Sequence, residues 1–348
     1  MDYSKHLFRA SSFGNLMTGA QGLTDAQHKE VTDLEALKTA KKPLTTKQQE
    51  DFDSLSVKEE LSTAENSKLE KLTSKSNEII GLTETKKKKL DKLVFQRDNT
   101  ILSKGAKTYL RKLRREIKFE RRVQLKSKFL TKGIEMEEEA IDFLSVWHDT
   151  EFTNNKLRVE NGFFTGEVDV LEGYDTKASW SLDTLPDPLE KLDSLYEFQN
   201  RVYMALHNAE KWTTSYVLIN ATDSELTNMI YREGFKWDGN NIPDWKKLEI
   251  LNLYIYDMAT FMLWCNSEDC LPDIDLYKEQ LETDNVDPAL EKAVNIFTSF
   301  VEIPDYERIV EKTTYRDLEL ESIMNDVVIL SREYMKEVEG TMLKQKPE

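Results

Sequence analysis

Four segments in the first hundred residues share one pattern, and this repeat limits how the N-terminal part of the chain can fold. They read LTDAQHKEVTDL, LTTKQQEDFDSL, LSTAENSKLEKL and LTETKKKKLDKL, and they begin at Leu23, Leu44, Leu61 and Leu82. In every copy a hydroxyl residue follows the leucine, and apolar residues stand seven and ten positions after that hydroxyl. These two positions share one face of an α-helix, so each copy predicts a short amphipathic helix.

The hydroxyl residues are suitable helix N-caps, because a side-chain oxygen at that position accepts a bond from a free amide of the first turn. They are Thr24, Thr45, Ser62 and Thr83, and three positions later the first three copies have Gln27, Gln48 and Glu65. A Gln or Glu at that spacing completes a capping box. We therefore expect each helix to begin directly after its hydroxyl residue.

A single helix of this kind has too narrow an apolar stripe to fold alone, so neighbouring copies must pack side by side as hairpins. The repeat predicts an antiparallel helical arm over residues 1–100. A docking site for a protein partner is the functional alternative to a purely structural arm. Nothing in the four copies suggests catalysis.

The charge of the chain is unevenly distributed. The net charge is -16, but residues 104–132 contain twelve Lys or Arg against Glu116 and Glu120, a local +10, which leaves -26 for the rest. Residues 101–130 predict a helix with Leu110, Leu113, Ile117 and Val123 inward and the basic residues outward. Such a helix is either a solvated basic surface or a surface that binds phosphate. The candidate DNA-binding residues are Lys104, Lys107, Arg111, Arg114, Arg115, Lys118, Arg121 and Arg122.

Length and composition are those of a globular protein of two or three domains, with 348 residues and 39% apolar residues. The N-terminal residues contain no uninterrupted apolar segment of a secretory signal. Residues 250–265, the most apolar stretch, are too short to span a bilayer, and we expect them to form a buried helix. Cys265 and Cys270 are the only cysteines, which gives no disulfide framework, so we expect free thiols and a cytoplasmic protein that contacts no membrane.

The stretch GEVDVLEGYDTKASW, from Gly166 to Trp180, has three charges in a strand-like setting. It predicts a β-hairpin with strands over residues 163–170 and 174–180. A two-residue loop would place Asp169 and Asp175 on opposite faces, whereas a three-residue loop over 171–173 pairs them and puts Gly173 at a left-handed position. We expect the second register.

In this register Asp169, Asp175 and Lys177 lie on one face of the hairpin. Two opposed carboxylates repel, and a divalent cation between them removes that cost. Lys177 would add a positive charge that holds a water or offsets charge on a phosphoryl group. The simpler alternative is a surface hairpin with its charges in water, and the same type of triplet occurs as Glu116-Ile-Lys118 in the basic segment.

The flanking sequence contains further motifs in a fixed order. Gly133-x-x-x-Glu137-x-x-Ala140 precedes the hairpin on an expected helix, and Gln199 and Tyr203 follow four apart on another, before an expected strand over residues 215–220. Together with Gly166-x-x-Asp169 and Asp175-x-Lys177, this set resembles the PD-(D/E)XK nuclease superfamily, in particular its branch of YqaJ, lambda-exonuclease and RecB-like nucleases. The resemblance covers residues 132–222. The Asp169–Asp175 spacing is shorter than is common in that superfamily.

The resemblance implies an α+β fold, mostly helical by content, with a restriction-endonuclease-like core whose central mixed sheet is flanked by helices. It implies that Glu137, Asp169 and Asp175, with the carbonyl of Thr176, bind Mg2+, for which Mn2+ can substitute. Lys177 would position the attacking water. Gln199 and Tyr203 would orient the site and the DNA strand.

Several residues leave alternatives open. Glu135, Glu138 and Glu139 stand beside Glu137 and could take its place, and His148, eleven residues further on, is either a ligand or an ordinary helix-end histidine. We expect the chain to divide into an arm over residues 1–100, a basic helix plus nuclease core over 101–222 and a mainly helical C-terminal region over 223–348. In this last region, residues 303–317 could include a strand.

The sequence therefore favours a metal-dependent DNA exonuclease acting in phage recombination or DNA processing. The alternative is a catalytically silent DNA-binding or packaging-associated protein that works through its arm. The expected partners are DNA and, through the arm, a recombination or packaging protein. A homo-oligomer is expected only by analogy with lambda exonuclease.

Overall fold

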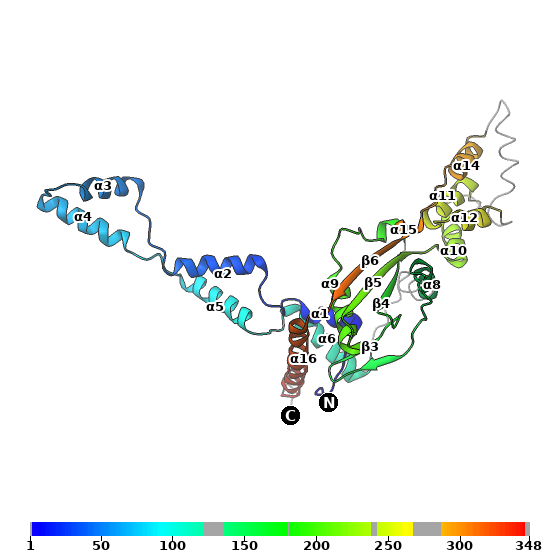
Figure 1. The fold of residues 1–348 in the computed structure, drawn as a ribbon, viewed down its shortest axis with the longest axis horizontal. Helices are drawn as coiled ribbons and strands as arrows, with labels where there is room; N and C mark the ends of the chain where they lie inside the picture. Colours follow the sequence, from blue (N-terminus) through cyan, green and yellow to red (C-terminus); the bar gives the residue numbers. More distant parts are fainter. Residues whose placement is uncertain (1, 122–135, 180, 238–241, 267–286, 345–348) are drawn as a thin grey trace. The chain divides into compact units, whose positions relative to one another are not determined.

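The computed structural model describes residues 2–121, 136–179, 181–237, 242–266 and 287–344, and the chain forms two compact units (Figure 1). The first unit consists of Met1–Asn15 and Leu113–Glu321, and the second of Leu16–Lys112 and Ser322–Glu348. This division differs from the expected boundaries after residues 100 and 222. The first residues of the chain belong with the sheets rather than with the arm, and the C-terminal region is shared between the units.

The arm in the second unit consists of the four helices that the repeat predicts. They are α2 (Asp25–Leu37), α3 (Thr46–Ser56), α4 (Thr63–Ser76) and α5 (Glu84–Asp98). All four expected N-caps accept a bond from the amide three residues later, and the capping boxes with Gln27, Gln48 and Glu65 are all present. The expected starts of these helices are therefore confirmed.

The arm helices pack in nested pairs, α2 against α5 and α3 against α4 (Figure 1). Val31, Leu34, Leu90 and Leu93 are buried together between the first pair. Between the two pairs, Lys41 bridges Ile79 in an antiparallel arrangement. In the second pair Leu55 and Leu72 are buried. Each pair thus buries repeated apolar positions, which one helix alone could not do.

Three further helices include residues of the second unit. They are α1 (Ala10–Met17), α6 (Lys104–Phe119) and α16 (Leu318–Lys344). The expected basic helix over residues 101–130 is therefore shorter at both ends in the described part, and Glu120 follows it with a left-handed φ of 51°. Within this unit the Lys107 ammonium lies 5.6 Å from the centre of the Tyr334 ring.

The first unit contains two three-stranded sheets, with the orders β1-β3-β2 and β4-β5-β6. Their strands are β1 (Phe8–Arg9), β2 (Arg158–Glu160), β3 (Phe164–Glu167), β4 (Tyr174–Ser179), β5 (Lys211–Leu218) and β6 (Ile309–Tyr315). β4 is parallel to β5 and β6 is antiparallel to it, so the second sheet is mixed.

Two helices cover opposite faces of the β4-β5-β6 sheet. On α8 (Glu137–Trp147), Ala140 and Leu144 pack in one core cluster with Val217. On α9 (Ser194–His207), the Asn200 amide donates to Thr214 Oγ1 at 3.0 Å. Residues 214 and 217 of β5 point to opposite faces because side chains alternate along a strand. The α+β class with a mixed sheet flanked by helices is confirmed.

The expected hairpin is present only at its turn. β3 ends at Glu167 and joins a different sheet from β4, and only Val170 and Tyr174 bridge between the two chain segments. The expected strand over 163–170 is therefore too long. The carbonyls of Val168 and Asp169 accept bonds from the Asn155 side chain and backbone, at 2.9 and 2.8 Å, instead of pairing with the next strand.

The remaining described elements of the first unit are mostly helical. They are η1 (Leu182–Thr184), α10 (Asp223–Gly234), α11 (Asp244–Tyr254), α12 (Met258–Cys265), α14 (Pro288–Thr298) and α15 (Asp305–Arg308). The expectation of one helix over residues 250–265 is wrong. α11 ends before Ile255, whose backbone is extended. The Asp257 carboxylate then caps the start of α12 by accepting from the Thr260 amide at 2.8 Å, and it also accepts from Asn220.

The strand expected within residues 303–317 is present as β6, and it completes the sheet that carries β4. None of the described helices is both long and apolar enough to cross a bilayer.

Candidate active site

The turn between β3 and β4 has the register that the sequence predicts. Val170 bridges Tyr174, which leaves a three-residue loop, and Gly173 in this loop has a φ of 95°. A side chain would be strained at that φ, so glycine is required there. Asp169 and Asp175 stand directly outside the bridge and therefore oppose each other across the turn.

Asp175 is the most deeply buried charged group of the site, with 1% of the residue exposed. Its Oδ1 accepts a hydrogen bond from Gln199 Nε2 at 3.0 Å. Its Oδ2 lies 2.5 Å from Lys177 Nζ but makes no bond of ordinary hydrogen-bond geometry. One Asp175 oxygen is thus fixed by the Gln199 amide, and the other lies against the Lys177 ammonium.

Asp169 is held by a single residue of the neighbouring strand. Its Oδ2 accepts from the Thr176 backbone amide at 2.8 Å and from the Thr176 hydroxyl at 3.2 Å. Burial, with added repulsion from Asp175 and Glu137, raises the pKa of Asp169 to about 6, although Lys177 and the Thr176 amide oppose the shift. The carboxylates are therefore close enough to repel, and bound positive charge would relieve the repulsion.

Lys177 pairs with Asp175 and is near enough to Asp169 to interact with it electrostatically. Burial alone would lower the pKa of its ammonium, but Asp175 and Asp169 outweigh burial and raise that pKa. The ammonium also donates to the Thr176 carbonyl at 3.3 Å and lies 5.5 Å from the centre of the Tyr196 ring. The lysine is held protonated, as a fixed positive charge beside the two carboxylates.

Helix α9 connects the site to the first sheet. Gln199 donates from Nε2 to Tyr203 Oη at 2.8 Å as well as to Asp175, and Tyr203 in turn donates to the Glu167 carbonyl at 3.0 Å. This chain of bonds fixes the orientation of Asp175. Gly166 permits the close approach, because a Cβ there would lie 3.0 Å from Tyr203 Cε1 and 2.9 Å from Leu206 Cδ1.

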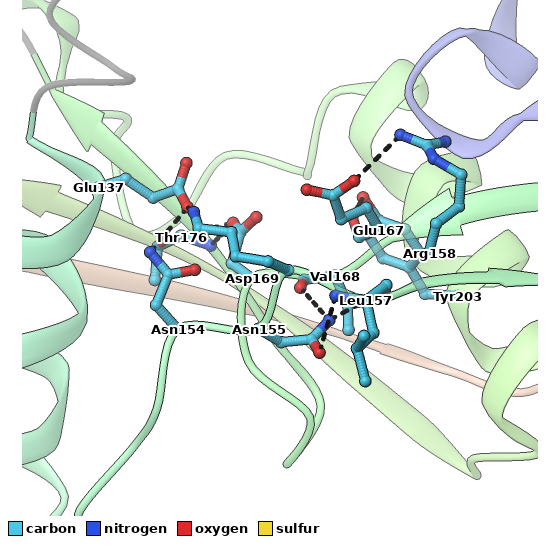
Figure 2. Close-up of polar contacts among 11 residues, drawn as sticks. Glu137, Asn154, Asn155, Leu157, Arg158, Glu167, Val168, Asp169, Thr176 and Tyr203 are labelled. Atoms are coloured by element: carbon cyan, nitrogen blue, oxygen red, sulfur yellow. Dashed lines mark hydrogen bonds and ion pairs between the residues drawn. The ribbon is translucent and has the colours of Figure 1, made fainter.

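Glu137 is the first residue of α8 and is partly buried, whereas Glu138 and Glu139 are exposed. Its Oε1 accepts from Asn154 Nδ2 at 3.0 Å (Figure 2). The same oxygen accepts from Lys156 Nζ at 2.7 Å. Of the three described glutamates in this run, Glu137 is thus the one directed at the site. Glu135 and Gly133 lie outside the described residues.

The loop Asn154-Asn155-Lys156 is the part of the site that the sequence reasoning missed. Asn154 and Lys156 bind Glu137, and Asn155 binds the backbone of Val168 and Asp169 (Figure 2). The available signal was two amides and a lysine in a row just before a strand. That composition is also typical of an ordinary loop, so it is weak evidence by itself.

The donor chemistry of the site fits Mg2+ better than a softer metal. Asp169, Asp175 and the Thr176 carbonyl supply only oxygen, and Mg2+ is usually bound by one or two carboxylates together with water and substrate phosphate. Among the described residues, however, no three His, Cys, Asp or Glu side chains are grouped so that they could hold a metal ion. Glu137 is engaged by Asn154 and Lys156 instead.

The basic residues expected to bind DNA differ in their exposure. Exposed positions are Lys104, Lys107, Arg111, Arg115 and Arg121, and Lys118 is partly buried. Arg114 is only 5% exposed, so its expected place on the outer face of the helix is wrong, because it shares the buried side of α6 with Leu110. Arg122 and Val123 lie outside the described residues.

His148 and Cys265 are packed against other parts of the fold. His148 follows α8, and its Nε2 lies 2.9 Å from Glu311 Oε1 while its ring contacts Phe152 and Tyr174. These contacts are those of a packed helix-end histidine. Cys265 is buried, and Cys270 lies outside the described residues.

Comparison with solved structures finds similarity to a phage-related exonuclease from Haemophilus somnus 129PT, with a TM-score of 0.44 and 22% sequence identity. The match covers 69% of this chain and 85% of that chain. No protein-family model and no curated protein matches this chain. At this identity and TM-score, the function has to be argued from the residues of the chain itself.

Proposed function

We propose that this protein is a metal-dependent deoxyribonuclease, an exonuclease that hydrolyses phosphodiester bonds in phage recombination or DNA processing. The observation that carries the proposal is the cluster of Asp169, Asp175 and Lys177, in which two carboxylates repel each other and the ammonium pairs with Asp175. Without a cation the repulsion between the two carboxylates is unfavourable, and a metal bound by such oxygen ligands can supply the water and the charge that phosphodiester hydrolysis needs.

We propose a role for each residue of the site. Asp169 and Asp175, with the Thr176 carbonyl, would hold Mg2+ or Mn2+, with Glu137 as a further ligand. The bound metal supplies a water of lowered pKa and neutralises charge on the phosphate. Lys177, protonated and fixed by Asp175, positions the attacking water and offsets negative charge in the transition state. Gln199 and Tyr203 keep Asp175 in place.

DNA is the proposed substrate because the exposed basic residues of α6 offer a surface for backbone phosphates. Contacts to phosphate carry no base information, which suits an enzyme that digests DNA without sequence preference. The acidic remainder of the chain would disfavour binding elsewhere.

A gel assay on linear and circular DNA, with and without Mg2+, tests the proposal. We expect linear DNA to be degraded only with Mg2+, and closed circular DNA to survive. The variants Asp175→Asn and Lys177→Ala should remove the activity, while Lys191→Ala, which changes an exposed lysine after β4, should not. DNA binding without hydrolysis in the wild-type protein would favour the catalytically silent alternative.

A further inference from the structure

Glu137 has a positively charged partner within the protein. The Lys156 ammonium lies 2.7 Å from Glu137 Oε1, and the Lys156 side chain is 66% exposed while that of Glu137 is 26% exposed. The Asn154 amide donates to the same oxygen at 3.0 Å. One carboxylate oxygen therefore has a charged donor that is open to solvent and a neutral donor beside it.

The two donors differ in how easily they can leave. A solvent-exposed ion pair contributes little, because water screens the charges and the long lysine side chain loses freedom in it. The Asn154 amide is short and comes from a loop that Asn155 fastens to the Val168 and Asp169 carbonyls. Lys156 can thus move away while the Asn154 amide, which Figure 2 shows beside Glu137, continues to orient that carboxylate.

The described acidic and lysine side chains of the site leave a net negative charge. Asp169, Asp175 and Glu137 carry three negative charges, and Lys177 and Lys156 are the lysines in contact with them among the described residues. The Lys177 side chain is partly buried, whereas that of Lys156 is largely in solvent. The hydrogen bond to Glu137, with Asp169 and Glu167 adding to it, raises the pKa of Lys156, so its ammonium stays charged.

We propose that Lys156 is a built-in counter-ion for Glu137 which a divalent metal displaces, so that Glu137 becomes a ligand only when the metal takes the place of the ammonium. This inference rests on the proposed metal-dependent nuclease function and deepens it. Lys156 is a positioning residue here, because it acts through Glu137. Its charge weakens metal binding and keeps the acidic site neutralised while the metal is absent.

Metal binding without DNA tests this directly, with Mn2+ titrated calorimetrically into the full-length protein at low salt. Lys156→Ala removes a positive charge a few ångströms from the site and should tighten Mn2+ binding about five- to tenfold. Lys156→Arg keeps the charge and should restore the wild-type affinity. The double variant Lys156→Ala/Glu137→Gln should not bind Mn2+ more tightly than the wild type, because it lacks the Glu137 carboxylate for which Lys156 and the metal compete.

Lys236→Ala is the matched control, since Lys236 is 70% exposed and pairs with Glu233 at 2.6 Å. It should leave the Mn2+ affinity unchanged. An unchanged or weaker affinity in Lys156→Ala, with wild-type protein that does bind Mn2+, overturns the inference and leaves the nuclease proposal standing. Absence of Mn2+ binding in both proteins overturns both. Melting curves without metal confirm that each variant is folded.

Discussion

The Lys177 ammonium lies 2.5 Å from Asp175 Oδ2, between two neighbouring positions on the same face of β4. Lys177→Ala leaves the buried carboxylate without its charge partner, which should cost on the order of 3 kcal/mol of folding stability. It also removes the positive charge beside the proposed scissile phosphate, which should lower the rate of hydrolysis by roughly 10²–10³-fold. Urea unfolding and a single-turnover DNA cleavage assay measure the two effects separately.

Lys177→Met is the companion variant, because it keeps most of the side-chain volume and removes the charge. It should lose activity as fully as Lys177→Ala. If Lys177→Met digests linear DNA at the wild-type rate, the lysine has no role in the chemistry.

Asp169 makes stability depend on pH in a direction that is unusual for a carboxylate. Its pKa in the folded protein is raised to about 6 from 3.8, first by burial and then by Asp175. Between these values the folded state holds a proton that the unfolded state has released, so stability falls as the pH rises from 4 to 6. Two pKa units correspond to about 3 kcal/mol at most.

The measurement compares unfolding of wild-type protein and Asp169→Asn at pH 4 and pH 7, without metal. The wild type should lose about 2–3 kcal/mol relative to Asp169→Asn over this interval. Adding Mg2+ at pH 7 should return part of the loss in the wild type only, because a ligand that binds the folded state stabilises it. Parallel pH profiles for the two proteins would contradict a raised pKa at Asp169.

Truncating a buried side chain between α2 and α5 should destabilise this helix pair without destabilising the sheets. Leu90 is 1% exposed and packs with Val31 and Leu34 between α2 and α5. Leu90→Ala should cost about 2–5 kcal/mol in that helix pair. Hydrogen exchange of the amides in α2 and α5 should accelerate while that of β5 stays unchanged. Val57→Ala, at an 82% exposed position of the arm, is the control and should change neither.

Patterns that act within a few residues were predictable from the sequence. The N-caps at Thr24, Thr45, Ser62 and Thr83 were readable because capping involves only the residue and the next turn. The register at Gly173 was readable because loop length and a glycine at a left-handed position decide it together.

Features set by contacts between distant segments were not predictable in this way. β1 is two residues long and is defined by its pairing with β3, since Phe8 lies opposite Phe164. The chain beyond residue 222 supplies β6, whose pairing with β5 completes the sheet under the candidate site. Lys156 and Asn154 contact Glu137 from a loop whose composition is only weak evidence for this, because it is also typical of an ordinary loop.

The exposed basic residues of α6 should contribute to DNA binding through phosphate contacts. Arg111→Ala and Arg115→Ala should each weaken binding equally for unrelated sequences, since phosphate contacts carry no base information. Each should also reduce the slope of log affinity against log salt by about 0.9. Arg232→Ala changes an exposed arginine on α10 and serves as the control. Unchanged salt slopes in both α6 variants would exclude these side chains from the DNA surface.

Gly166 tests whether the approach of α9 to β3 sets the geometry of the site. A methyl group there would meet Tyr203 Cε1 at 3.0 Å and Leu206 Cδ1 at 2.9 Å, so Gly166→Ala requires these two side chains of α9 to shift. The overpacking should cost about 1–3 kcal/mol. It should also lengthen the bonds from Gln199 to Asp175 and to Tyr203, and therefore lower the cleavage rate.

Gly162→Ala is the matched control, because a Cβ at Gly162 meets no atom within 4 Å. It lies just before the same strand and should leave both stability and cleavage near the wild-type values. A Gly166→Ala protein that is destabilised but cleaves normally would show that the bonds of Gln199 do not set the position of Asp175. If cleavage falls together with stability, Gly166 of the Gly166-x-x-Asp169 motif is needed for the orientation of Asp175 on β4.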